Sequence, residues 1–537
     1  MHEVASLASH ADRSRFGYGF SELARFIKWS FVGGGIGSSQ RFGTLCREIG
    51  LISAILSSMQ RIRWRQEYLV VLFFVVAVVV RFFPIPTDLF FGPEQGKDAF
   101  AVRQIYDDKK FPLIGAKTDV DGIFHGPLFY YFLALPYGLS GGNPVAASFT
   151  TIVVNCLSIF LFYCLGKTLF SQRIGLLAAF FFTLSLRMIE YARWLSAQPL
   201  SPLLVLVLMY TLYQLARAKR GYLYLSLFVS GLLIQLQLLH AYFLPPMLVI
   251  YAYVAKIKFR LKESIIGVCI FAITLSTFFA FEIRHNFLMS KNVAAVFRGE
   301  KGFHAPLSSS IRETSERFGK EVMLMLTPNH SIISWTLVGV GFLLCLGALR
   351  RKSFSGYHLV VLFLLVPVIV LATSRHSVLS HYFIFVAPTI FFLAALVIDF
   401  LWKYSRGVAL AVVVFFAFTN LSALRLLLPW GITIATEKYI IDFIYHDAGG
   451  RQFRYEAYTF PYFWKDAWDY MFLWYGQPRY GYVPKDQGVE LVYFIWEEED
   501  TNYQRFWFAD HVSQYGNIVT QTKHDNVHVE RREKPKK

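Results

Sequence analysis

Apolar residues along the chain are gathered into repeated stretches that short polar segments separate. Each stretch is roughly 17–25 residues long, which is the length of a helix that crosses a bilayer. We expect about eleven such helices. They are predicted near residues 67–84, 145–167, 174–190, 198–216, 221–239, 241–256, 263–282, 332–349, 356–373, 380–401 and 407–426. The pattern therefore predicts a mainly α-helical, multi-pass membrane protein whose residues 59–427 form a helical bundle.

Basic residues in the short loops give this bundle an orientation. They precede the first apolar stretch and then recur in alternate loops, as Arg61, Arg63, Arg65, Lys167, Arg173, Arg217, Lys219, Arg220, Lys256, Lys258, Arg260, Lys262, Arg350, Arg351, Lys352, Lys403 and Arg406. Cytoplasmic loops of membrane proteins are enriched in Lys and Arg. We therefore expect a cytoplasmic N-terminus in a bacterial-type plasma membrane, and an odd number of helices then places the C-terminal region outside.

The first long segment on the outer side covers residues 85–144. Its part from Gln95 to Tyr106 predicts a helix. The stretch from His125 to Gly141 is rich in Tyr and Phe and too short to cross a bilayer, which is typical of a helix that lies in the membrane interface. A second outer segment is expected over residues 283–331.

The two ends of the chain differ from the bundle. Residues 428–537 mix helix-like pieces with strand-like pieces such as VELVYFIW (Val489–Trp496), which predicts a small α/β domain outside the membrane. The last ten residues, His528–Lys537, are expected to be disordered. Residues 1–58 are Ser- and Gly-rich without a long apolar run, so we interpret them as a disordered extension or a mis-assigned start.

Composition agrees with a membrane protein and excludes other classes. The 537 residues are 55% hydrophobic and 17% charged, against about 25% charged in soluble domains. The net charge of +17 does not indicate nucleic-acid binding, because no basic tract rises above the loop pattern. The five cysteines form no CxxC motif and predict neither a disulfide framework nor a metal site.

An acidic motif follows the first apolar stretch directly, in the sequence FGPEQGKDAF (Phe91–Phe100). Pro93 is suited to the first turn of a helix, and Glu94 and Asp98 then share one helical face. Lys97 lies one turn from Glu94 and can moderate the repulsion between the carboxylates. A simpler interpretation is that Glu94 only stabilises the helix N-terminus and that Asp98 is solvated.

Several arginines and histidines are predicted to lie at the outer ends of the helices or in the outer loops, on the same side of the membrane as this motif. They are Arg81, Arg187, Arg193, Arg284, Arg375, His125, His240, His285, His376 and His381. Ionisable groups at membrane depth are costly and usually line a cavity or a reaction path. The alternatives are arginines that reach the lipid headgroups and buried, hydrogen-bonded histidines.

This set of residue types suits the transfer of a group from a lipid phosphate. Arginine and lysine bind phosphate, and a carboxylate beside them can take a proton from an acceptor hydroxyl or amine. A transporter of lipid-linked sugars is the alternative, and it predicts inverted repeats and broken helices near the midplane. A scaffold protein whose active part is the C-terminal segment is a further alternative.

An ordered series of motifs carries a resemblance to a known family. The motifs are GPEQGKDAF, AVRQIYDDKKFPLIGAKT, HGPLFYYFLALPYGLSGGNP, EYARWLSAQP, QLQLLH and HYFIFVAP. Over roughly residues 60–430 the chain resembles the multi-span glycosyltransferases of the protein O-mannosyltransferase and lipid A aminoarabinose transferase type, which have the GT-C fold. The resemblance implies transfer of a sugar from a polyprenyl-phosphate-linked donor to a lipid, glycan or protein acceptor on the outer face, by inverting displacement.

The resemblance also implies roles for individual residues. Glu94 occupies the first acidic position, whose carboxylate is the base, and Asp98 the second. The sequence has Glu94 where Asp is common and Gly96-Lys97 where relatives have Ala-Arg, so the division of labour between the carboxylates stays open. The expected donor-phosphate ligands are Lys97, Arg103, Arg193 and Arg375. The expected sugar or acceptor ligands are His125, Tyr130, His240, His381 and Tyr382. No metal ligand is assigned, and whether a divalent cation takes part is left undecided.

Overall fold

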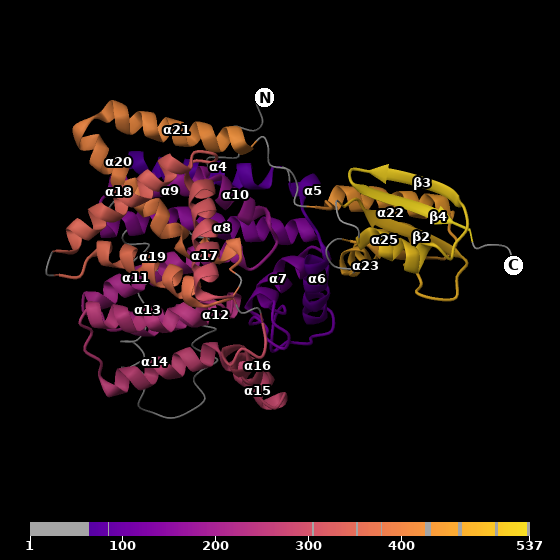
Figure 1. Cartoon of the computed structure of the whole chain (residues 1–537), viewed down its shortest axis with the longest axis horizontal. Helices are drawn as coiled ribbons and strands as arrows, with labels where there is room; N and C mark the ends of the chain where they lie inside the picture. The colour runs from indigo at the N-terminus through magenta and orange to yellow at the C-terminus, as the bar shows by residue number, and fades with distance from the viewer. Residues whose placement is uncertain are drawn as a thin grey trace, which may run out of the picture. The chain divides into compact units, whose positions relative to one another are not determined.

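The computed structural model describes residues 64–83, 85–302, 305–350, 353–376, 378–424, 431–459, 464–499 and 503–533. The predicted extension, residues 1–58, lies outside the described residues. Residues 64–537 form one compact unit. Within it a large helical body is followed by a C-terminal domain with a β-sheet (Figure 1).

Every predicted apolar stretch is helical. The helices of the body are α4 (Trp64–Phe82), α8 (Pro144–Leu169), α9 (Gln172–Leu184), α10 (Leu186–Arg193), η1 (Gln198–Leu200), α11 (Ser201–Ala216), α12 (Tyr222–Leu236), α13 (His240–Val254), α14 (Leu261–Thr274), α15 (Ser276–Arg284), α18 (Ser331–Leu349), α19 (Gly356–Thr373), η2 (Ser380–Val386), α20 (Ala387–Tyr404) and α21 (Arg406–Leu424). The segments predicted to lie outside supply α5 (Ile85–Asp88), α6 (Pro93–Tyr106), α7 (Leu128–Leu139), α16 (Leu288–Phe297) and α17 (Leu307–Leu326).

Among the described residues, fewer helices than the predicted eleven have the length and composition of a membrane crossing. Over the described ranges, six helices are long and apolar enough to cross a bilayer, and eight if each of two bent helix pairs counts as one crossing. The bent pairs are α9 with α10 and α14 with α15. Helices α12 and α13 are apolar but have 15 residues each, which is shorter than the roughly 20 that a crossing needs.

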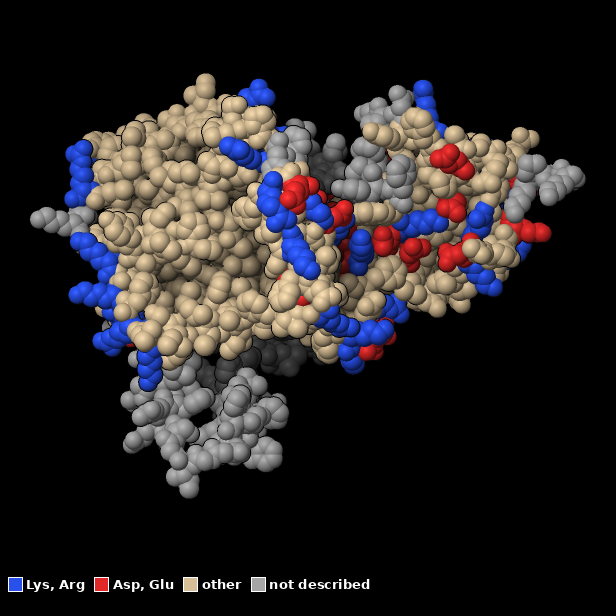
Figure 2. All heavy atoms as spheres, turned by 60° about the horizontal axis from the view of Figure 1, so that its bottom comes forward, with Lys and Arg blue, Asp and Glu red and all other residues tan. Residues whose placement is uncertain are grey.

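The surface of the helical body is apolar where lipid would contact it. Exposed side chains include Val71 and Val75 on α4, Val268 on α14, and Val414 and Phe418 on α21. Figure 2 shows a broad uncharged surface, with Lys and Arg gathered at one end of the body and charges of both signs toward the other. Such a belt in a water-soluble protein would cause aggregation. The chain is a multi-pass membrane protein, as predicted.

The break between α9 and α10 has its own hydrogen-bond partners. The two helices bend by 56°, which frees backbone groups that must be satisfied inside a membrane. The guanidinium of Arg81 is fully buried and donates to the carbonyls of Phe182 (2.8 Å) and Thr183 (3.0 Å). On the other side, Asn420 Oδ1 accepts from the N–H of Leu186 at 2.8 Å. Arg81 therefore stabilises this break through its two terminal nitrogens, Nη1 and Nη2.

A buried ion-pair cluster joins α10 to α17. The guanidinium of Arg187 contacts both carboxylate oxygens of Glu321, at 2.5 and 2.8 Å, and also Glu190 at 2.8 Å. The hydroxyl of Tyr191 donates to Glu321 at 3.0 Å. The side chain of Glu321 is fully buried, so its charge is stabilised by these partners alone. Sequence patterns missed this cluster, because Glu321 lies far from the other three residues along the chain.

Replacing Glu321 by alanine should lower the stability of the protein. The change leaves the Arg187 charge with one carboxylate partner in a buried place, and breaking a buried ion pair costs about 3–5 kcal/mol. We expect a lower midpoint of thermal unfolding in detergent. Glu316→Ala on the exposed side of α17 is the matched control and should leave the midpoint unchanged. Equal midpoints for the two variants would contradict this account of the cluster.

The C-terminal domain is an α/β domain, as predicted. Its strands are β1 (Phe453–Tyr458), β2 (Leu491–Glu497), β3 (Ile518–His524) and β4 (Val527–Arg532), in the sheet order β1-β2-β4-β3. Strands β1 and β2 are parallel and the other two pairs are antiparallel. The helical segments are α22 (Ile434–Ala448), α23 (Asp466–Met471), η3 (Phe472–Gly476), α24 (Gln477–Tyr480), α25 (Tyr503–Trp507) and η4 (Phe508–Val512).

The expectation that His528–Lys537 is disordered was wrong for the first half of this segment, and residues 534–537 lie outside the described residues. Residues 528–532 belong to β4, which pairs with β2 on one side and β3 on the other. Val527 and Val529 are fully buried, and His528 between them faces the other side of the strand. The charged residues Glu530, Arg531 and Arg532 that follow the two valines hid this short alternation in the sequence.

Candidate active site

The acidic motif forms the first turns of α6. Pro93 occupies the first helical turn and the N–H of Gly92 donates to the side-chain oxygen of Gln95 at 3.1 Å. This bond satisfies one of the free N–H groups at the helix start. Glu94 is exposed and Asp98, one turn later, is half-buried. The helix begins two residues before the predicted one and ends at the predicted Tyr106.

Asp98 is held by a tyrosine of the neighbouring helix. The hydroxyl of Tyr130 on α7 donates to Asp98 Oδ1 at 2.7 Å. Burial raises the pKa of Asp98 to about 7, the hydrogen bond from Tyr130 opposes this shift, and the charge of Glu94 adds to it. The same surroundings raise the pKa of the Tyr130 hydroxyl, which therefore stays a donor. Asp98 can consequently bind or release a proton close to neutral pH.

Glu94 is coupled to a loop carboxylate between α6 and α7. Partial burial raises the pKa of Glu94, the charge of Asp119 raises it further, and Lys97 opposes both. The Asp119 carboxylate in turn accepts from the hydroxyl of Tyr382 in η2, at 3.4 Å. The structure thus brings Glu94 into the same neighbourhood as Tyr382, although the two residues come from distant parts of the chain.

Three predicted histidines lie near one another. His125 interacts electrostatically with both His240 and His381. Its Nδ1 accepts from the N–H of Leu238 at 3.1 Å, just before α13. Burial lowers the pKa of His125 to about 4, so the ring is neutral at pH 7. A neutral imidazole suits a hydrogen bond to a hydroxyl better than the charge of a phosphate.

The other two histidines have different surroundings. His240 Nδ1 lies 2.7 Å from the carbonyl of Leu233 and donates to it, which matches the interpretation of a buried, hydrogen-bonded histidine. The ring of His381 contacts Trp194 and Tyr382, with ring centres 5.4 and 4.8 Å apart. His381 therefore contributes to an aromatic wall that α10 and η2 build together.

The four predicted phosphate ligands are not brought together. Lys97 acts electrostatically on both carboxylates, and its ammonium lies 4.6 Å from the ring centre of Trp464 in the C-terminal domain. Arg103 forms an ion pair with Asp107 at 2.8 Å. Nine residues separate Glu94 from Arg103, which places them on opposite faces of α6.

The two remaining arginines belong to other elements. Arg193, at the end of α10, donates from Nη2 to the carbonyl of Val80 at 3.1 Å. Arg375 is exposed in the loop after α19, has a left-handed backbone (φ 59°), and its carbonyl accepts from the N–H of Ala305 at 3.0 Å. The structure records no contact of either guanidinium with the two α6 carboxylates.

Gly96 explains one departure of the acidic motif from the family pattern. A Cβ at this position would lie 2.4 Å from the carbonyl of Asp466 and 2.5 Å from the N–H of Ala467, both at the start of α23. The rings of Phe100 and Tyr470 meet edge to face at 5.3 Å along the same contact. The helix that carries Glu94 and Asp98 is thus backed directly by the C-terminal domain, a contact that sequence patterns did not indicate.

A metal site is not formed by the described residues. No group of three or more His, Cys, Asp or Glu side chains lies in a position to hold an ion there. Asp121, in the loop between α6 and α7, pairs with Lys117.

Comparison with known proteins supports the fold. Residues 124–281 match the family model described as dolichyl-phosphate-mannose-protein mannosyltransferase. ArnT of Cupriavidus metallidurans, solved bound to undecaprenyl phosphate, is similar at a TM-score of 0.57 and 15% identity, over 86% of this chain and 97% of that chain. The apo structure of ArnT gives a TM-score of 0.58 at 14% identity with the same coverage. No curated protein sequence matches the chain.

A weaker likeness exists to the oligosaccharyltransferase of Archaeoglobus fulgidus, with a TM-score of 0.48 and 13% identity over 71% of this chain and 55% of that chain. The likeness to ArnT extends over 86% of the chain and confirms the predicted GT-C fold.

Proposed function

We propose that this multi-pass membrane glycosyltransferase of the GT-C fold moves a sugar from a polyprenyl-phosphate-linked donor to an acceptor on the extracytoplasmic face. The observation that carries the proposal is the arrangement around α6. Two carboxylates with raised pKa values stand one turn apart; Tyr130 donates to Asp98, and Asp119, which accepts from Tyr382, acts on Glu94.

Glu94 is the base in this proposal. Its carboxylate is the exposed one of the pair, so an acceptor hydroxyl or amine can approach it, and the raised pKa makes it a stronger proton acceptor. As Glu94 takes the proton, the acceptor oxygen or nitrogen attacks the anomeric carbon. The bond from that carbon to the phosphate oxygen breaks on the opposite face, which inverts the configuration.

Other residues orient the reactants. Asp98, fixed by Tyr130, raises the basicity of Glu94 through its charge. Lys97 supplies positive charge one turn from Glu94, where a leaving phosphate would need stabilisation. Neutral His125 and the aromatic wall of His381 and Tyr382 suit the hydroxyls and the ring of a sugar. Arg193 and Arg375 would need to turn from their present positions to bind phosphate.

The donor class rests on the relatives. The chain contains a segment that matches dolichyl-phosphate-mannose-protein mannosyltransferases, and ArnT has been solved with undecaprenyl phosphate. Dolichyl phosphate and undecaprenyl phosphate are both polyprenyl phosphates, which supports a lipid-linked sugar donor for this protein.

The distribution of charge supports the sidedness of the proposal. Basic residues occupy the alternate short loops that the positive-inside rule assigns to the cytoplasm. In this proposal helix α6 and the C-terminal domain lie on the same side of the membrane, because Gly96 of α6 packs against the start of α23, and we assign that side to the outside. In this arrangement residues 59–427 bind the lipid donor, and the C-terminal domain backs the helix that carries the base.

The proposal can be tested with purified protein in detergent. Radiolabelled polyprenyl-phosphate hexoses are supplied with a membrane extract as the source of acceptor, and the release of free polyprenyl phosphate is followed. We expect release that depends on both the protein and the extract. The absence of release with every donor sugar would contradict the transferase proposal.

Transport of a lipid-linked sugar is the alternative that one observation favours. The bends in the α9–α10 and α14–α15 pairs are broken helices of the kind that transporters use. Reconstitution into vesicles separates the two functions. Movement of the labelled donor between leaflets without loss of its sugar would favour transport, whereas cleavage of the sugar–phosphate bond would favour transfer.

The rate of transfer should depend on pH through Asp98. Below pH 7 its carboxyl is mostly protonated, because burial raises its pKa to about 7. As the pH rises through 7, ionised Asp98 adds negative charge next to Glu94 and makes Glu94 a stronger base. We therefore expect kcat/KM to rise with an inflection near pH 7, and Asp98→Asn to lose that inflection. The same profile in both proteins would contradict this role.

A further inference from the structure

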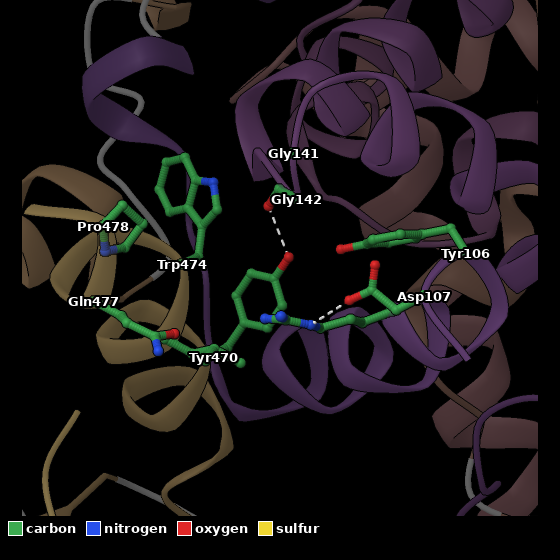
Figure 3. Close-up of a pocket in the computed structure, with 10 residues that line it drawn as sticks. Tyr106, Asp107, Gly141, Gly142, Tyr470, Trp474, Gln477 and Pro478 are labelled. Atoms are coloured by element: carbon green, nitrogen blue, oxygen red, sulfur yellow. Dashed lines mark hydrogen bonds and ion pairs between the residues drawn. The ribbon is translucent and has the colours of Figure 1, made fainter. Parts of the chain in front are cut away.

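A pocket lies on the opposite side of α6 from Glu94. It has a volume of about 260 Å³ and is formed where the end of α6 and the loop after α7 meet α23, η3 and α24. Figure 3 shows Tyr106 and Asp107 on one side, Trp474, Gln477 and Pro478 on the other, and Tyr470 between them. The volume is just below the roughly 300–1,000 Å³ of pockets for drug-sized ligands, so it fits one sugar ring.

Aromatic rings make up much of the pocket wall. Tyr106, Tyr470 and Trp474 all line it. The hydroxyl of Tyr470 donates to the carbonyl of Gly142 at 2.7 Å, which fixes the position of this ring. Flat aromatic faces pack well against the C–H face of a pyranose and bury it at a low entropic cost.

The polar groups of the pocket have no net charge. Arg103 and Asp107 form an ion pair at 2.8 Å within it, and the amide of Gln477 is exposed at its edge. The pair offers N–H donors and carboxylate acceptors, and the amide offers both kinds. Sugar hydroxyls need this mixture of donors and acceptors, whereas an anionic phosphate would be repelled by Asp107. In this structure Arg103 is engaged by Asp107.

The aromatic surface continues out of the pocket along the C-terminal domain. Next to Trp474, the ring of Tyr475 lies 5.6 Å from the guanidinium of Arg479, and Lys438 lies 5.3 Å from the ring of Trp474. A chain of sugars could leave the pocket over these rings. The pocket also connects the helical body with the C-terminal domain, so an occupant would hold the two together.

We propose that this pocket binds a neutral pyranose unit of a glycan. The proposal concerns binding alone and does not depend on the transfer reaction. A single sugar ring of about twelve heavy atoms held at typical ligand efficiency should have a Kd of about 1 mM.

Saturation-transfer NMR on the full-length protein in detergent can test this proposal. The probes are the methyl pyranosides of glucose, galactose, mannose and N-acetylglucosamine, each titrated to 20-fold above the expected Kd, with inorganic phosphate as a charged competitor. We expect at least one glycoside to give a saturable signal that phosphate does not displace. The absence of saturable binding, or displacement by phosphate at equal concentration, would overturn the proposal.

Variants locate the binding site. Trp474→Ala and Gln477→Ala should each weaken binding of the glycoside at least about tenfold. If Trp474→Ala also lowers the thermal unfolding midpoint, Gln477→Ala is the decisive variant, because Gln477 is exposed and its loss removes no packing. Tyr503→Ala, an exposed aromatic on α25 outside the pocket, is the control and should bind like wild type. An unchanged Kd in Gln477→Ala and in a folded Trp474→Ala would place the sugar elsewhere and overturn the proposal.

Discussion

Replacing Glu94 by glutamine should lower the rate of sugar transfer at least about a hundredfold, because the amide cannot take the acceptor proton. The side chain keeps its size and its exposed position on α6, so binding of the lipid donor should change little. The measurement is single-turnover release of polyprenyl phosphate from a radiolabelled donor at pH 7.5, with KM for the donor determined in parallel. A lower kcat at similar KM is the expected result.

Asp98→Asn distinguishes the two carboxylates. The amide can still accept the hydrogen bond from Tyr130 but carries no charge, so we expect a smaller loss than for Glu94→Gln. Asp108→Asn, in the exposed loop after α6 where Asp108 pairs with Lys110, is the matched control. Wild-type rates for Glu94→Gln together with complete loss for Asp98→Asn would assign the base to Asp98 and refute the proposed division.

Replacing Gly96 by alanine should separate the acidic helix from the C-terminal domain. The added methyl would lie 2.4 Å from the backbone of Asp466, and a backbone cannot turn aside as a side chain can. Overpacking of this kind costs about 1–3 kcal/mol, which exceeds the gain of up to about 1 kcal/mol from the better helix propensity of alanine. We expect a lower unfolding midpoint and at least about a tenfold lower transfer rate.

Limited proteolysis and activity measure this effect together. Displacement of α23 should expose the linker around residues 431–433 and speed cleavage between the helical body and the C-terminal domain. Gly339→Ala is the control, because a Cβ there meets no atom within 4 Å in α18. Wild-type stability and turnover in Gly96→Ala would show that the contact with α23 does not position the helix.

Local patterns determined the elements of this protein well. Lengths of apolar stretches located the helices of the body, since crossing a bilayer imposes a length on each one. Proline at the helix start and the spacing of Glu94 and Asp98 located α6 to within two residues. The strand β4 was missed because three charged residues follow its valines, and charge in a short strand resembles a solvated tail when only the sequence is considered.

Bilayer physics acts on single stretches of chain, so the sequence by itself determined that this is a multi-pass helical membrane protein with a conspicuous acidic helix. Its ordered motifs also predicted the GT-C fold. Contacts between distant segments were decided only by the tertiary structure. The Arg187–Glu321 pair, the meeting of Asp119 with Tyr382, and the docking of α23 on Gly96 each join residues that no sequence spacing relates. Arg103 shows the consequence, because its residue type suits phosphate, while its helical face and its Asp107 partner direct it to another pocket.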